Sequence, residues 1–82
     1  MDLLAILDLK NIKSLYHLYF NEVFGDECQP TLFLQKNLKK PYHIDYCFAG
    51  SYWHEKLHYV NVGKPEEWLS KSDHMPVLFE FS

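Results

Sequence analysis

Two short stretches decide how this chain is interpreted: Ser72–Val77, which reads SDHMPV, and His43–Tyr46, which reads HIDY. Asp73 and His74 come just before the run Val77–Phe81, whose branched and aromatic side chains predict a β-strand. The proline of the SDHMPV stretch lacks a backbone N–H and restricts the residue before it to an extended conformation. We therefore predict a stiff turn that presents the imidazole of His74 at the start of a strand.

A second acidic residue lies in an apolar environment. Asp45 belongs to the apolar segment Ile44–Phe48, where an ionised carboxylate is costly unless a donor hydrogen-bonds to it. A carboxylate that fixes the tautomer of a histidine, with a second carboxylate beside that histidine, can orient a base and hold a cation or a phosphate. We predict that Asp45 orients His74 and that Asp73 is the second carboxylate. The alternative is an exposed turn, with a buried Asp45 satisfied by backbone amides.

The segments Lys40–Phe48 and Ser72–Val77, in this order, resemble the closing motifs of the endonuclease/exonuclease/phosphatase superfamily. These metal-dependent phosphohydrolases have a deoxyribonuclease-I-like fold, in which an Asp-Tyr strand is followed by a Ser-Asp-His-x-Pro turn and a last strand. The resemblance covers about the second half of the chain. It implies that His74 is the base or the phosphate-contacting histidine, that Asp45 orients it, and that Asp73 is a carboxylate on the metal side.

The resemblance also implies a reaction and a cofactor. Members of the family hydrolyse phosphoester substrates with a divalent cation, usually Mg²⁺ and alternatively Mn²⁺. The family's amino-terminal Asn, its metal-binding Glu and its central Asp-x-Asn motif have no counterpart in this sequence. We therefore expect residues 1–82 to form a single partial domain that is inactive alone and does not retain the cation. The alternative is a non-catalytic interaction module, or a fragment that assembles with a partner chain.

The order of the predicted elements indicates an α+β fold. We expect a small, mostly antiparallel sheet of about four strands with one or two helices, resembling the carboxy-terminal part of a two-sheet αββα sandwich. The predicted strands are residues 31–35, 42–49, 57–62 and 77–81, the first two forming a hairpin. Asp2 can cap a helix that ends near Lys10, and Pro65 can begin another. Residues 14–24 fit either a helix or an aromatic loop, which Gly25 ends in both cases.

Composition bounds the size and the ligands of the protein. The chain has 82 residues, of which 48% are hydrophobic and 17% aromatic, and this composition argues against disorder. A chain this small buries only about 60–65% of the surface that its unfolded form exposes, so we expect a thin core. The net charge is -3 and Arg is absent, so the sequence lacks a basic surface and bidentate phosphate contacts. Nucleic acid as a ligand is left open.

The apolar side chains of the predicted sheet indicate a protein partner. They are Leu32, Leu34, Ile44, Tyr46, Phe48, Val60, Val62, Leu78 and Phe79. In the family, this sheet packs against a second sheet from the amino-terminal part. We therefore expect a homodimer or a complex with a complementing amino-terminal half, because contiguous exposed apolar patches are rare in monomers. The alternative is a monomer in which residues 1–24 cover the open face.

The first residues do not resemble a targeting segment. Leu3–Leu7 is apolar, but Asp2 precedes it and Asp8 interrupts it, which supports neither a signal peptide nor a membrane span. Cys28 and Cys47 could form one disulfide, but the chain lacks the cysteine density of a small secreted scaffold, so we expect reduced thiols. We therefore predict a cytoplasmic protein without membrane association.

A competing metal motif is present in the segment His54–His58, which reads HEKLH. On a helix, the pattern H-E-x-x-H places two imidazoles on one face for zinc, with Glu55 as the general base of a small zinc protease. The motif needs several helical turns and a third protein ligand. Gly50 lies shortly upstream and a strand-like alternation begins at Leu57, so we interpret the match as accidental.

Overall fold

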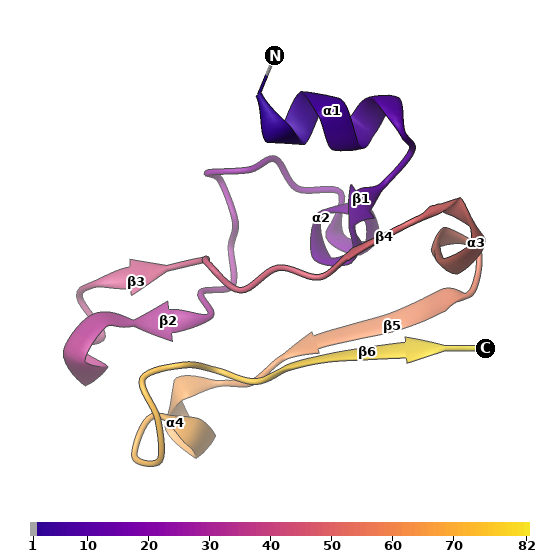
Figure 1. The fold of residues 1–82 in the computed structure, drawn as a ribbon. Coiled ribbons are helices and arrows are strands. Elements are labelled where there is room, and N and C mark those ends of the chain that lie inside the picture. The colour runs from indigo at the N-terminus through magenta and orange to yellow at the C-terminus, as the bar shows by residue number, and fades with distance from the viewer. Residues whose placement is uncertain (1) are drawn as a thin grey trace. The chain divides into compact units, whose positions relative to one another are not determined.

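The computed structural model describes residues 2–82. Within them, short helices and three two-stranded antiparallel sheets alternate along the chain, so the predicted α+β class is confirmed (Figure 1). The chain divides into two compact units. The first unit consists of the residues up to Glu22, Tyr46–Val60 and Phe79–Ser82, and the second consists of Val23–Asp45 and Asn61–Leu78.

Five elements lie wholly in the first unit. They are α1 (Leu3–Leu9), β1 (Lys13–Ser14), α2 (Leu15–Phe20), β4 (Phe48–Ala49) and α3 (Ser51–His54). Helix α1 begins as predicted, because Asp2 Oδ1 accepts a hydrogen bond of 2.8 Å from the backbone N–H of Ala5. Helix α2 resolves the open choice for residues 14–24 in favour of a helix. It ends before Gly25, because Asn21 adopts the left-handed conformation with φ 54°.

The core of the first unit forms where β1 meets α2. Leu15 and Tyr16 are buried there together with Ser14 and His17. Strand β1 pairs antiparallel with β4 in the register Ser14↔Phe48, and the backbone N–H of Leu15 donates a hydrogen bond of 2.8 Å to the carbonyl of Cys47. A pair of two-residue strands and a short helix thus hold a small core.

The second unit contains β2 (Leu32–Phe33), the 3₁₀ turn η1 (Leu34–Lys36), β3 (Pro41–Tyr42) and α4 (Pro65–Trp68). Strands β2 and β3 form the predicted hairpin in the register Leu32↔Tyr42. The first predicted strand is shortened, because Gln35 and Lys36 have positive φ angles of 54° and 59° and cannot continue an extended strand. Phe33, Val62 and Met75 form the buried apolar core of this unit.

The predicted strand 42–49 is divided into β3 and β4, with residues 43–47 outside any ladder. The cause lies in the second unit, where the backbone N–H groups of Ile44 and Asp45 donate to the hydroxyl oxygen of Thr31. Because these donors point to a side chain, they are not available to a neighbouring strand. The loop that carries Asp45 is therefore held in the second unit by side-chain hydrogen bonds and not by strand pairing.

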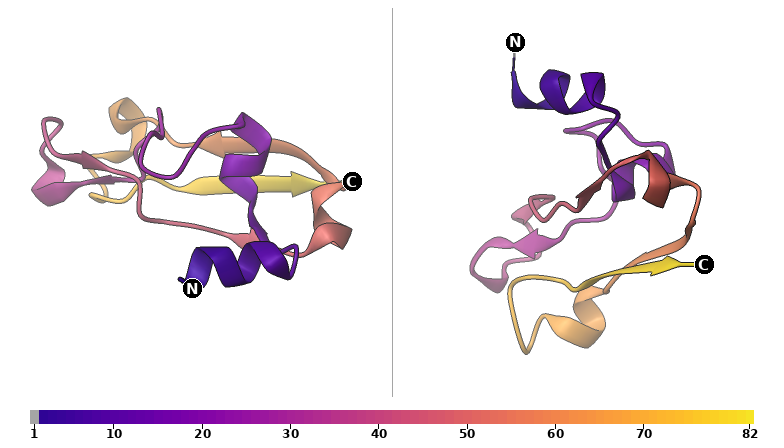
Figure 2. Two further views of the ribbon diagram at one scale, coloured as in Figure 1. Left: turned by 90° about the horizontal axis from the view of Figure 1, so that it is seen from above. Right: turned by 45° about the vertical axis from the view of Figure 1, so that its right-hand side comes forward.

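Strands β5 (Leu57–Val62) and β6 (Val77–Phe81) have the predicted bounds and form the third sheet. They run in opposite directions side by side, as Figures 1 and 2 show. In the first unit, Ser82 N–H donates to the carbonyl of Lys56 at 2.9 Å; in the second, Gly63 N–H donates to that of Pro76 at 2.8 Å. Among the described residues, no helix has the length and apolar character that crossing a membrane requires.

Candidate functional site

The turn that carries His74 lies against strand β2 in the second unit. The backbone N–H of Phe33 donates to the carbonyl of Asp73 at 2.8 Å, and the N–H of Met75 donates to the carbonyl of Thr31 at 2.7 Å. These bonds flank an antiparallel bridge between Leu32 and His74. Met75 is buried, so the turn is held both by backbone hydrogen bonds and by an apolar side chain. This arrangement matches the predicted stiff turn before the last strand.

The loop that carries Asp45 is attached to Thr31, the residue whose carbonyl also accepts from Met75 in the His74 turn. Thr31 is fully buried, and its Oγ1 accepts hydrogen bonds from the N–H groups of Ile44 at 3.0 Å and Asp45 at 3.1 Å. Its own N–H donates to the carbonyl of Tyr42 at 3.0 Å. Buried hydrogen bonds of this kind contribute about 0.5–1.5 kcal/mol each. Thr31 therefore joins the loop of Asp45 to the turn of His74.

The two predicted partners meet at this junction. Nδ1 of His74 lies 2.9 Å from Oδ2 of Asp45, so the predicted contact between the imidazole and the carboxylate is present. The side chain of His74 is 51% exposed and that of Asp45 is 43% exposed. Asp45 is thus not the buried carboxylate that its apolar neighbours suggested; it lies in residues 43–47, which are outside any ladder, and its side chain is partly exposed.

The carboxylates change the acid–base properties of His74. The hydrogen bond to Asp45 and the negative charge of that carboxylate raise the pKa of His74, and the charge of Asp73 acts in the same direction, while desolvation opposes them. When Nδ1 donates its proton to Asp45, the lone pair of the neutral imidazole is on Nε2. The pair can therefore present Nε2 as a base or, once protonated, as a donor to an anion.

The described residues supply too few ligands to hold a magnesium or manganese ion by themselves. Mg²⁺ prefers six oxygen ligands in an octahedron, usually from one or two carboxylates, water and substrate. Residues 2–82 contain no group of three or more His, Cys, Asp or Glu side chains placed to hold a metal ion. The Asp45 carboxylate already pairs with His74, which leaves Asp73 as a lone carboxylate at the turn.

The H-E-x-x-H segment lacks the helix on which its zinc chemistry depends. Helix α3 ends at His54, whose Nε2 lies 2.7 Å from the carbonyl oxygen of Ala49. His58 belongs to strand β5, where its Nε2 lies 3.5 Å from Oε2 of Glu80. The two imidazoles are therefore not stacked on one helical face, because a strand begins at Leu57 as predicted.

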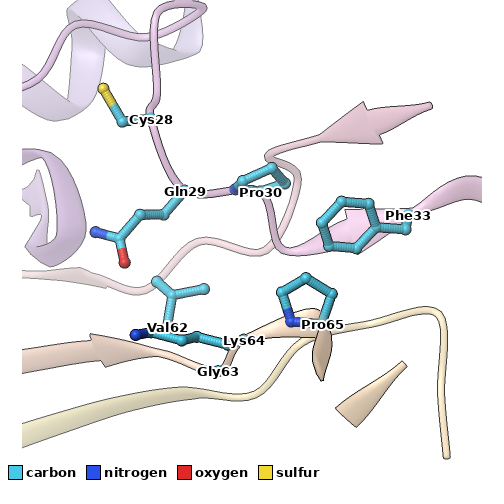
Figure 3. A pocket seen from close by; sticks show the side chains of 8 residues that line it. All are labelled: Cys28, Gln29, Pro30, Phe33, Val62, Gly63, Lys64 and Pro65. Atoms are coloured by element: carbon cyan, nitrogen blue, oxygen red, sulfur yellow. The ribbon is translucent and has the colours of Figure 1, made fainter. Parts of the chain in front are cut away.

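A small cavity of the second unit lies apart from the His74 site. Its volume is about 180 Å³, and its lining residues are Cys28, Gln29, Pro30, Phe33, Val62, Gly63, Lys64 and Pro65 (Figure 3). Small-molecule sites usually measure about 300–1,000 Å³ and contain converging polar groups. This cavity is smaller and mostly apolar, and none of His74, Asp45 and Asp73 lines it. We therefore assign the candidate site to the histidine and its carboxylates.

Thr31 is the site residue that the sequence did not identify. In the sequence it is only the first position of a predicted strand, where threonine is common. Its hydroxyl acts across 13 and 14 residues of chain, a separation that no local pattern encodes.

Comparison of the chain with protein-family models, curated proteins and solved structures gave no match.

Proposed function

We propose that this chain supplies the histidine–carboxylate part of a divalent-metal-dependent phosphoester hydrolase of the endonuclease/exonuclease/phosphatase type. The contact of 2.9 Å between His74 and Asp45, with Asp73 next in the chain, is the observation that supports it. The motif resemblance gives the same three residues their roles. In this proposal the cation is Mg²⁺ or Mn²⁺, its remaining ligands come from a complementing amino-terminal half, and the isolated chain is inactive.

The geometry of the pair supports a specific chemical role in this proposal. Asp45 holds the proton on Nδ1 of His74, so Nε2 either takes a proton from a nucleophilic water or, as part of an imidazolium, donates to a phosphate oxygen. Both roles need a half-exposed ring, because substrate must reach Nε2. The exposure of His74 meets this requirement. We further propose a cytoplasmic location, in which Cys28 and Cys47 stay reduced.

Phosphate recognition can be tested on the isolated chain. We expect phenyl phosphate to shift the ring resonances of His74 in NMR, compared with chloride at equal ionic strength. His58 is the internal control, because it also lies beside a carboxylate and is similarly exposed, but it belongs to strand β5. Equal shifts at both rings, or no shift at His74, would contradict the proposal. Turnover of a phosphodiester with Mg²⁺ by the isolated chain, lost in His74→Ala, would contradict its inactivity.

A second function is favoured by an exposed aromatic cluster of the first unit. Trp53 packs edge-on against Tyr52 and Phe81, with ring centroids 5.1 and 5.2 Å apart, and all three side chains are exposed. As an interaction module, the chain would form a homodimer through this surface. We then expect Trp53→Ser to weaken self-association in sedimentation equilibrium, whereas His74→Ala leaves it unchanged. A compact monomer at high micromolar concentration that binds no hydrophobic dye would exclude this function.

A further inference from the structure

We propose that the side-chain hydroxyl of Thr31 positions the Asp45–His74 pair. This inference deepens the proposed function, on which it rests for the use of the pair, by naming the residue that aligns its base. Its test measures the histidine itself and does not require hydrolysis. Thr31 is a positioning residue, because its contacts are to the backbone of the site loops and not to a reacting atom.

The pair does not hold itself together. Asp45 and His74 are 29 residues apart in the chain, and both side chains are about half exposed. An exposed ion pair gains little net free energy, because water competes for both groups and two side chains lose their freedom. Asp45 lies between the end of β3 and the start of β4, outside any ladder, whereas His74 is joined to Leu32 of β2 by an isolated bridge. Another group must therefore fix the loop of Asp45 relative to the turn of His74.

Thr31 contacts both loops from a fully buried position. Oγ1 accepts from the N–H of Asp45, and the carbonyl oxygen accepts from the N–H of Met75, the residue after His74. Because the residue is buried, water does not compete for these hydrogen bonds. The two contacts use different atoms, so only the hydroxyl contact depends on the identity of the side chain. A substitution can therefore release the Asp45 loop while the His74 turn stays attached.

The matched substitutions at this position are Thr31→Val and Thr31→Ser. Valine has nearly the same shape but offers no acceptor to the two amides, whereas serine keeps the acceptor and loses only a methyl group. Ser72→Ala is the neighbouring control, since the Ser72 hydroxyl accepts a hydrogen bond of 3.0 Å from the N–H of His74 but is local to the turn. Methyl resonances of Met75 and Val62 report whether each variant keeps the core of the second unit.

The measurement is an NMR titration of His74 together with the nitrogen shifts that report its tautomer. In Thr31→Val we expect the pKa of His74 to fall toward the value measured in Asp45→Asn, and the preference for a proton on Nδ1 to be lost. Thr31→Ser and Ser72→Ala should behave like the unsubstituted chain. An unchanged pKa and tautomer in a folded Thr31→Val variant would overturn the inference.

A second measurement covers the case in which Thr31→Val does not fold. In the unsubstituted chain, the amides of Ile44 and Asp45 should exchange with solvent as slowly as that of Met75, because Thr31 accepts from all three. Exchange of the first two at the rate of an unstructured loop would overturn the inference. If Thr31→Val changes His74 but phenyl phosphate does not, positioning is supported and the proposed function fails. If phenyl phosphate shifts the His74 resonances but Thr31→Val leaves the pKa and tautomer of His74 unchanged, the proposed function is supported and the positioning role of Thr31 fails.

Discussion

Two histidines of this chain have oxygen partners of opposite character. His17 Nδ1 lies 2.7 Å from Oγ of Ser14, three residues earlier, and His17 is only 7% exposed. His74 Nδ1 lies 2.9 Å from Oδ2 of Asp45, which is 29 residues distant, and the ring is half exposed. The first contact is local and buried, whereas the second joins two distant loops at the surface.

The difference separates a structural histidine from a candidate functional one. Ser14 is the N-cap of α2, and a side chain three residues later naturally reaches back to this position. The contact satisfies two buried polar groups, and the His17 ring also packs against Tyr16 and Tyr46. An exposed pair assembled from two loops contributes little to stability, which leaves its geometry compatible with a chemical role. Accessibility therefore makes His74 the candidate for chemistry, whereas His17 contributes to packing.

The largest expected effect tests this assignment by truncating each ring. We expect His17→Ala to lower the free energy of unfolding of the first unit by about 2–3 kcal/mol, because it leaves a cavity and an unpaired Ser14 hydroxyl. His74→Ala should leave the unfolding midpoint of the second unit nearly unchanged. Urea unfolding measures both in single-tryptophan variants, in which Trp53 reports the first unit and Trp68 the second. Equal destabilisation by the two substitutions would contradict the distinction between a structural His17 and an accessible His74.

A second test compares two glycines, one in each unit. A Cβ on Gly63 would lie 2.7 Å from Cδ of Pro76 and 2.8 Å from Cδ1 of Trp68, whereas a Cβ on Gly50 would meet no atom within 4 Å. Overpacking of this kind costs about 1–3 kcal/mol, so Gly63→Ala should destabilise the second unit by that amount. Gly50→Ala should change the stability of the first unit much less. Similar losses for both variants would contradict the tight packing behind the His74 turn.

The sequence predicted those parts of the molecule that local chemistry controls. The α+β class, the bounds of β5 and β6, the cap of α1 by Asp2 and the start of α4 at Pro65 are confirmed. The contact between Asp45 and His74 was also predicted, because the two motifs contain complementary side chains. In each case, the decisive residues are neighbours in the chain or carry a distinctive chemical pattern.

The differences arise where a long-range contact or an unusual backbone angle prevails. Residues 43–47 have strand-like composition, but the Thr31 hydroxyl withdraws two of their amides from any ladder. Gln35 would extend β2 by its pattern, yet its left-handed conformation ends the strand. Helix α2 ends at Phe20 and not at Gly25, since its C-cap Asn21 adopts a positive φ, which asparagine also tolerates. Neither the partner of a hydroxyl nor a non-glycine left-handed turn is visible in hydrophobic periodicity.

A third, smaller effect concerns the pH dependence of the second unit. The raised pKa of His74 means that the folded state binds its proton more tightly than the unfolded state does. This contribution to stability is complete below the ordinary pKa of histidine and is lost as the pH rises through the raised pKa. We expect Asp45→Asn to lower the pKa of His74 in NMR and to flatten this pH dependence. His58→Ala is the control, and a His74 titration unchanged by Asp45→Asn would remove the pair from the site.

The smallest effect is expected at His58, a second histidine with a carboxylate partner. Nε2 of His58 and Oε2 of Glu80 lie 3.5 Å apart on the β5–β6 sheet, and both side chains are about half exposed. This pair resembles Asp45–His74 in accessibility. It differs because it lies on two strands and not on loops that a buried hydroxyl holds. His54, the other histidine of the H-E-x-x-H segment, belongs to α3 and faces the carbonyl of Ala49. We therefore expect the purified, untagged chain to contain no stoichiometric zinc, and His58→Ala to change neither metal content nor the response of His74 to phenyl phosphate. Elemental analysis and the NMR titration measure these quantities. One equivalent of zinc that is lost in His58→Ala would move the functional assignment from His74 to the first unit.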